Sequence, residues 1–400
     1  MKRNIDFPEY QEYKSFRLTN EQRPYFGLEK IDENWEEIEI KEGTSAFFEG
    51  DIIKKIITWE NFRQFEHNEI DTKIETIDRE YILPKTNRGK KKKITPTNLL
   101  APMPTGCSLY ITFNKNVANS IISASCTRNK KHLPITEDKE IMSITDLNNW
   151  IKNYIKTCPT DYFEKVNKMR SSEHTTVKYE VGDIFRFEID REHYGFGLII
   201  GKYSDIRKHN LFPENHPMSS AMTVPILVRL YKIKTKNPGL SQKEICCSDL
   251  LPPTLISDNE IIWGTHEIVA LKELEENEID FPMLAEYRVR RDDSNYICFA
   301  WGNGMKIING ISKVPNEIMN NNNCIGVSLG LPIHQLNRAF QGYNAYSYDD
   351  LRNTRNELKR AAVFELFELS DSMDIDAFNK LSGGLTRNEY IEWTRKIKKG

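Results

Sequence analysis

Hydrophobic residues recur at every second position in several parts of the chain, and this alternation predicts strands. Phe185, Phe187 and Ile189 show the period of a strand with one buried face. Short runs rich in Ile, Tyr, Phe and Thr, separated by turn residues, fill residues 35–133 and 179–306. The sequence therefore predicts two β-rich regions.

Three glycines follow the first of these patterns at a spacing close to that of dinucleotide-binding loops. The three glycines are Gly195, Gly197 and Gly201. In a dinucleotide-binding loop, a helix begins at the last glycine of the motif. Instead, the glycines enclose the β-favouring run 198–200, and residues 204–217 carry two prolines and no apolar helical repeat. Gly195 and Gly197 are therefore predicted to lie inside a strand, where their bare face lets another backbone or a tight barrel wall approach.

Helical spacing of apolar residues appears between and after the β regions. Ser143 is a candidate cap for a helix that reaches about Cys158, and a second helix is predicted over 162–169. Near the C-terminus, Ser347 is predicted to start a helix, and Thr386 with Glu389 is predicted to start the last one. The apolar stripe expected on the C-terminal segment consists of Leu351, Leu358, Ala362, Leu366 and Leu369.

Together these patterns predict an α+β protein that is mostly β, with a C-terminal helical segment. The expected parts are an N-terminal β-rich domain (1–142), a helical connector (143–174), a central small-barrel-like β domain (175–306), an irregular linker (307–346) that contains the asparagine run 320–323, and the C-terminal helical segment (347–400).

Composition narrows the class of protein. The 400 residues carry a net charge of −2, which argues against a general nucleic-acid binder. No run of about twenty apolar residues could span a bilayer, and no secretory signal is readable at the N-terminus, so a cytoplasmic location is expected. The seven cysteines form no CxxC pair, and their odd number favours reduced thiols.

Residues for catalysis or metal binding do not converge in the sequence. The eight histidines show no HxH or HExxH spacing, so no metal, cofactor or catalytic residue is expected. His193 with Asp183 and Asp190 could form an acid–base cluster, although a polar hairpin turn at 190–193 is the stronger interpretation. The basic run 88–93 is predicted to be a solvated loop; alternatively, it could form a phosphate-binding loop.

Several short motifs resemble the immunity protein 26 family of bacterial polymorphic toxin systems. The resemblance covers about a third of the chain, and the segment Leu83–Thr86 followed by Arg88–Lys90 resembles an N-terminal extension of longer members. The motif residues that carry it are Gly182, Asp183, Tyr194, Gly195, Gly197, Trp263, Gly264, Phe281 and Pro282.

The resemblance implies a mostly β protein without catalysis of its own, whose partner is a cognate toxin domain. We expect the motif residues to hold the fold, with Trp263 in the core rather than in a partner pocket. Because charge complementarity speeds association, an acidic stretch is the candidate partner-binding surface: Glu273, Glu275, Glu276, Glu278 and Asp280. The alternative function is a small-barrel nuclease or nucleic-acid-binding module that uses the basic loop 88–93.

Overall fold

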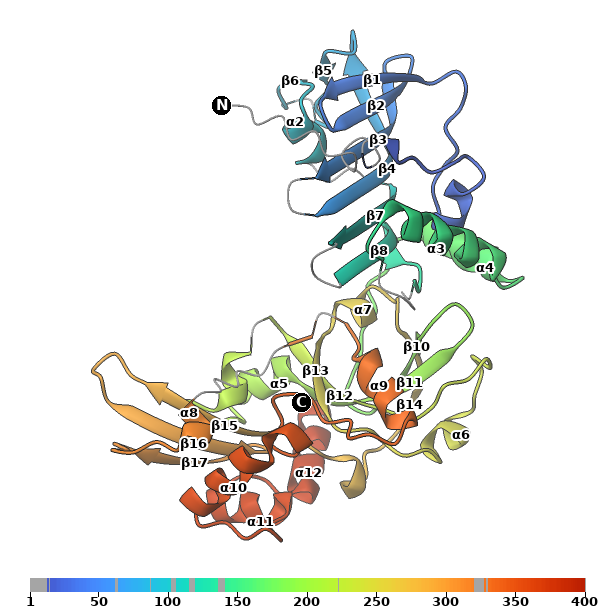
Figure 1. Cartoon of the computed structure of the whole chain (residues 1–400). Coiled ribbons are helices and arrows are strands. Elements are labelled where there is room, and N and C mark those ends of the chain that lie inside the picture. Colours follow the sequence, from blue (N-terminus) through green and yellow to red (C-terminus); the bar gives the residue numbers. More distant parts are fainter. Residues whose placement is uncertain are drawn as a thin grey trace. The chain divides into compact units, whose positions relative to one another are not determined.

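The fold is α+β and mostly β, as predicted (Figure 1). The computed structural model describes residues 13, 15–61, 64–86, 88–101, 106–114, 119–135, 141–221, 223–319, 327–328 and 330–399. The asparagine run 320–323 and Cys324 lie outside them. The chain divides into two compact units, one comprising residues 1–175 with 190–192 and the other 176–189 with 193–400. The other six cysteines are free thiols.

The first unit is built on a long antiparallel sheet with the strand order β1-β2-β3-β4-β7-β8-β9, to which the β5–β6 hairpin adds at β4. The strands are β1 (Glu36–Lys41), β2 (Thr44–Glu49), β3 (Ile52–Asn61), β4 (Phe65–Ile77), β5 (Tyr81–Ile82), β6 (Lys92–Lys93), β7 (Cys107–Asn114), β8 (Asn119–Cys126) and β9 (Lys131–His132). The short helices are η1 (Arg23–Phe26) and α2 (Pro96–Leu100).

Two longer helices belong to the core of this first unit. Ser143 caps α3 (Ile144–Lys156) as predicted, because its hydroxyl accepts the backbone N–H of Asp146 at 3.1 Å. The buried face of α3 and that of α4 (Tyr162–Ser171) pack with apolar side chains of β7 and β8. The helices expected to form a connector therefore bury their apolar faces within the first unit (Figure 1).

The second unit contains two antiparallel sheets. The five-stranded sheet has the order β13-β12-β11-β10-β14 and the three-stranded sheet the order β15-β16-β17. Their strands are β10 (Asp183–Glu188), β11 (Tyr194–Lys202), β12 (Pro225–Leu230), β13 (Thr254–Ser257), β14 (Glu267–Leu271), β15 (Met283–Val289), β16 (Asn295–Trp301) and β17 (Gly304–Asn309). The helices between and after them are α5 (Tyr203–Lys208), η2 (Pro217–Ser220), α6 (Gln242–Cys246), α7 (Asn259–Ile262), η3 (Glu276–Glu278), α8 (Asn316–Met319) and α9 (Ile333–Phe340).

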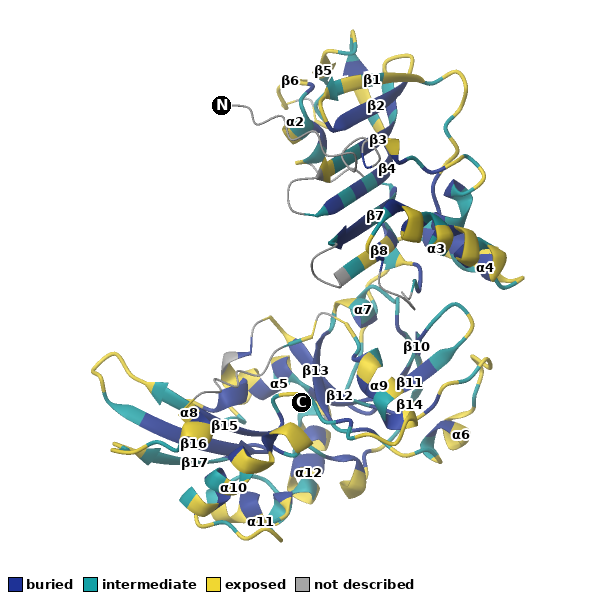
Figure 2. Ribbon diagram, in the orientation of Figure 1, coloured by how far each residue is buried: buried dark blue, intermediate teal, exposed yellow. Residues whose placement is uncertain are grey.

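The five-stranded sheet is open, so the expected small barrel is wrong. β13 and β14 form its two edges and do not pair with each other within the residues that the structure describes. Both faces of the sheet are covered instead. One face packs with α9, and the other joins the largest core with the three-stranded sheet and the C-terminal helices (Figure 2). Since helices and a second sheet bury both faces, the sheet needs no closure.

The glycine strand is confirmed: Gly195 and Gly197 lie in β11. In the register with β10, Gly197 lies opposite Phe185 and Gly195 opposite Phe187. A Cβ atom added at Gly197 would lie 2.3 Å from Cζ of Phe185, and one at Gly195 would lie 2.4 Å from Cζ of Phe187. The bare face therefore admits two aromatic rings from the neighbouring strand, not the backbone or barrel wall that was expected.

The C-terminal segment differs in detail from the prediction. Residues 347–356 form turns and η4 (Thr354–Asn356), and the first helix, α10 (Glu357–Leu366), begins ten residues after Ser347. Leu351 is buried, but Leu358 is 77% exposed because the intervening turns shift the helical phase. Val363 and Phe364 are buried in the core, and Ala362, Leu366 and Leu369 of the expected stripe are partly buried against it.

Two further helices complete the C-terminal segment, and both contribute to the largest core. α11 (Ile375–Ser382) ends at Gly383, whose φ of 78° is left-handed. The capping box of Thr386 and Glu389 starts α12 (Arg387–Lys399) as predicted. Tyr390 of α12 donates to the carbonyl of Ile200 in β11 at 2.9 Å. In the part of the chain that the structure describes, no helix has the length and apolarity to cross a membrane.

Candidate partner-binding site

The acidic segment 273–280 links the edge strand β14 to β15 and exposes three of its carboxylates. Glu273, Glu275 and Glu276 are exposed, with 86% of the Glu273 side chain and 69% of the Glu275 side chain open to solvent. Glu273 pairs with Arg395 of α12 at 3.0 Å. This exposed pair contributes little stability, so Glu273 can exchange it for a partner's cation.

Glu278 has an internal role, because it is only 6% exposed. Its Oε1 lies 2.5 Å from Nζ of Lys272, and its Oε2 accepts the backbone N–H of Glu275 at 2.9 Å. Burial lowers the pKa of Lys272, but the hydrogen bond and the charge of Glu278 outweigh burial and raise it overall. Glu278 therefore closes the turn from inside.

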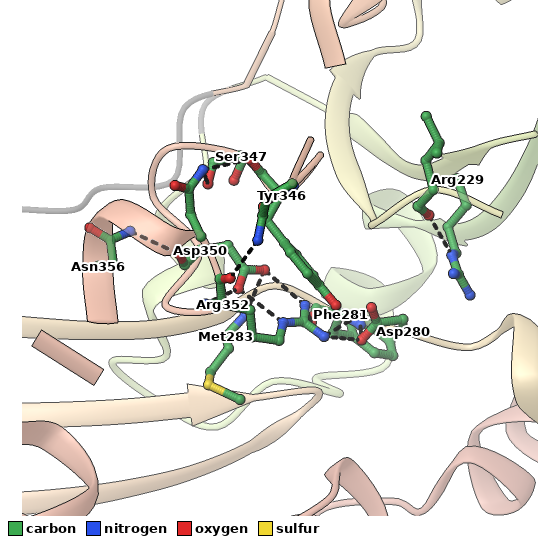
Figure 3. Close-up of polar contacts among 12 residues, drawn as sticks. Arg229, Asp280, Phe281, Met283, Tyr346, Ser347, Asp350, Arg352 and Asn356 are labelled. Carbon is green, nitrogen blue, oxygen red and sulfur yellow. Dashed lines mark hydrogen bonds and ion pairs between the residues drawn. The ribbon is translucent and has the colours of Figure 1, made fainter. Parts of the chain in front are cut away.

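Asp280 is bound by Arg352, which comes from the C-terminal segment (Figure 3). Nη1 of Arg352 donates to both carboxylate oxygens of Asp280, and Nη2 donates to the carbonyl of Phe281 at 2.8 Å. The same guanidinium binds Asp350 through Nε at 2.9 Å and Nη2 at 2.8 Å, and lies over the Tyr346 ring. Burial lowers the pKa of Arg352, but the Asp350 carboxylate dominates and raises it. Asp280 is thus part of a buried polar cluster.

A second arginine holds the backbone of the same segment. Arg229 of β12 donates from Nη1 to the carbonyls of Asn277 and Glu278 at 3.1 and 3.0 Å, and from Nε to Leu251 at 2.8 Å. Because Arg229 binds the middle of the segment and Arg352 binds its end, the path of the backbone is fixed. The exposed carboxylates therefore project from a rigid support.

Apolar side chains lie beside these carboxylates. Val269 and Leu271 on the edge strand β14 are 39% and 51% exposed. Leu271, Glu273 and Glu275 also line a shallow groove of about 630 Å³ next to α6. We define the 269–276 surface as Val269, Leu271, Glu273, Glu275 and Glu276. The sequence did not single out its two apolar members, because nothing in the local pattern tells an edge strand from a central one.

Two motif glycines serve the fold near this surface. Gly182 has a φ of 96°, and a Cβ there would lie 2.3 Å from the carbonyl oxygen of Lys272. Only glycine therefore allows β10 to start so close to the acidic segment. Asp183 accepts the backbone N–H of Glu180 at 2.7 Å and closes this turn. Gly264, with a φ of 66°, ends the turn after α7.

The remaining motif residues are also placed inside the second unit. Phe281 is buried and packs edge-to-face on Tyr390 with ring centroids 5.1 Å apart, and Pro282 is buried beside it. Tyr194 is half-buried, and the guanidinium of Arg186 lies over its ring. Trp263 caps α7 and is half-buried. Phe281 and Pro282 are thus buried as expected of residues that hold the fold, whereas Trp263 does not lie in the core as predicted.

Asp183 does not meet His193 in the acid–base cluster that the sequence left open. Asp183 lies at the start of β10, and His193 follows the opposite end of the same strand. The two side chains are therefore separated by the length of a strand. Among the described residues, no group of three or more His, Cys, Asp or Glu side chains could hold a metal ion.

The second unit is β-rich and presents the exposed 269–276 surface on a backbone held by Arg229 and Arg352. Residues 180–291 match the family described as Immunity protein 26, which confirms the resemblance seen in the sequence. The matched segment runs from the start of β10 to just beyond β15 and contains the whole 269–276 surface. Comparison with curated proteins and comparison with solved structures give no match.

Proposed function

We propose that the protein is an immunity protein that neutralises a cognate toxin by binding it stoichiometrically, without catalysis or a cofactor. The observation that carries this proposal is that the family match at 180–291 contains an exposed acidic and apolar surface on a fixed backbone. The toxin would be bound in the cytoplasm of the cell that makes both proteins, before it can act.

The 269–276 surface fits a partner with a basic patch flanking an apolar contact. Glu273, Glu275 and Glu276 would attract cationic side chains and raise the association rate, while Val269 and Leu271 would supply the desolvated centre of the interface. Rigid presentation lowers the conformational entropy that is lost on binding. A toxin whose own ligand is anionic, such as a nuclease, would have its basic active site covered by this surface.

The proposal is tested by co-expressing the toxin domain encoded beside this gene with the intact chain. We expect full protection of the cells. The triple variant Glu273→Lys, Glu275→Lys and Glu276→Lys should lose it. A matched control reverses three exposed acids of the first unit, Glu33, Glu39 and Glu60, and changes the net charge equally. That control should still protect. If the intact chain protects against no linked toxin, the proposed function is wrong; if both triple variants protect, only the contact surface is wrong.

A further inference from the structure

The first unit contains a pocket of about 650 Å³ at one end of its sheet, outside the immunity-type segment. The pocket is lined by residues of β4, of β5 and β6, of the loop that joins β5 to β6, and of helix α2. Its apolar wall consists of Ile74, Ile82, Leu83 and Pro84. Its cationic lining consists of Lys73, Lys85, Lys90 and Lys92.

Local hydrogen bonds fix the shape of this pocket. The backbone N–H of Leu83 donates to the carbonyl of Glu75 at 2.9 Å and ties the loop to β4. Gly89 donates to the carbonyl of Thr86 at 2.9 Å, and a Cβ at Gly89 would lie 2.4 Å from Cβ of Pro84. Glycine is therefore needed for the loop to fold back on itself. The shape of the pocket is therefore set by backbone hydrogen bonds within the loop and between the loop and β4.

Strand alternation sorts the basic run into two sets. In the β5–β6 register, Lys92 lies opposite Ile82 and Lys93 opposite Tyr81. Residues that face each other across two strands share one side of the sheet. Accordingly Ile82 and Lys92 line the pocket, whereas Lys91 and Lys93 do not. Lys90 and Lys92 thus have the same charge and similar exposure as Lys91 and Lys93, but only the first pair lines the pocket.

The pocket concentrates positive charge that the protein itself leaves unpaired. Lys73, Lys85, Lys90 and Lys92 are exposed, and none of them has an ion-pair partner among the residues with described positions. Among the described residues that line the pocket, Glu75 alone is acidic. Four ammonium groups around a small, partly apolar volume repel one another, and an anion with several charges would relieve that repulsion.

We propose that this pocket binds a free nucleotide, whose base lies against the apolar wall and whose phosphates meet the lysines. Its volume is within the range of small-molecule sites, about 300–1,000 Å³. Aliphatic side chains such as Ile82 and Pro84 suit the flat face of a base, and Thr86 and Asn98 add polar groups to the lining. This binding site is independent of toxin neutralisation by the second unit.

Calorimetric titration of the full chain with ATP tests the proposal, with inorganic phosphate and a single-stranded oligonucleotide as further arms. We expect ATP to bind at least about tenfold more tightly than phosphate, since phosphate has no group for the apolar wall. Replacing Lys90 and Lys92 by Glu should weaken ATP binding about tenfold or more, while the matched pair Lys91→Glu and Lys93→Glu should weaken it less than about threefold.

Three results would overturn the proposal. The first is the absence of ATP binding by the intact chain. The second is an equal loss of ATP binding in the two double variants, which would indicate a general electrostatic effect of the basic run. The third is tighter binding of the oligonucleotide than of ATP, with equal dependence on both lysine pairs, which would show a nucleic-acid surface instead. Thermal unfolding of both variants checks that the first unit is folded.

Discussion

Arg352 and Asp280 lie 72 residues apart in the chain, yet Nη1 of Arg352 donates to both carboxylate oxygens of Asp280, at 2.9 and 3.0 Å. Asp280 belongs to the segment that matches the immunity family, whereas Arg352 lies beyond the end of the match. The C-terminal segment therefore supplies a contact that fixes the acidic surface of the matched segment.

Replacement of Arg352 should strongly destabilise the second unit. The Arg352→Met variant leaves Asp350, whose side chain is 1% exposed, without its cation. Loss of one partner of a buried ion pair costs about 3–5 kcal/mol. Urea unfolding followed by tryptophan fluorescence measures the loss. Arg355→Met, which removes an arginine that stacks on the exposed Tyr348, is the control and should cost less than about 1 kcal/mol. Equal effects would contradict the role of the cluster.

A chain that ends at residue 346 should not fold its second unit. The removed residues include Phe364, Phe378 and Tyr390, which lie in the same core as β11 and β15. Exposure of that core favours aggregation. Solubility and cooperative unfolding measure the outcome. A soluble, cooperatively unfolding and toxin-binding truncated protein would show that the C-terminal helices are an appendage.

Valine at position 197 should destabilise the central sheet. Its Cβ would enter the space of the Phe185 ring, so the ring must leave its position against β11. Overpacking of this kind costs about 1–3 kcal/mol. Gly239→Val is the control, because the nearest atom to a Cβ there is 3.5 Å away in an exposed turn. The free energies of unfolding of the two variants should differ accordingly. A neutral effect of Gly197→Val would mean that the ring is not packed on the glycine.

Stability should fall in mild acid through His216. This side chain is buried on Phe212, and burial lowers its pKa from 6.5 to about 3. At pH values between 3 and 6.5, His216 is protonated in the unfolded state but neutral in the folded state. Its contribution to the free energy of unfolding is therefore complete above pH 6.5 and declines as the pH falls towards 3. The loss is about 1 kcal/mol at pH 5.5.

The measurement is the free energy of unfolding between pH 7.5 and 5.5, compared with His216→Gln. The variant should show a shallower dependence on pH, although it is less stable overall. His67, whose pKa burial lowers to about 4, is retained in both proteins and cancels in the comparison. Identical slopes would contradict a neutral, buried His216.

Local signals in the sequence predicted much of the fold. Alternation at Phe185 and Phe187 predicted β10, and the hydroxyls of Ser143 and Thr386 marked two helix starts, because caps and strand faces depend on near neighbours. Leu358 was assigned to the wrong face, since a turn of unknown length before α10 resets the helical phase.

Long-range pairing could not be predicted in the same way. Lys55 and Glu69 are fully buried and lie 2.8 Å apart in the first unit, joined by Arg23 from 46 residues away. Charged side chains are normally exposed, so only the tertiary structure reveals such a network. For the same reason Glu275 and Glu278 looked equivalent in the acidic stretch, although one is exposed and the other closes the turn from inside.

The most direct test of stoichiometric neutralisation is to titrate the activity of the purified, genetically linked toxin domain with the full chain. Activity should fall linearly and reach zero at a fixed molar ratio, and higher salt should slow the association. The Glu273, Glu275 and Glu276 charge-reversal variant should need a large excess to inhibit. If activity is unchanged by excess intact protein, or is abolished by a small fraction of an equivalent, stoichiometric neutralisation is contradicted.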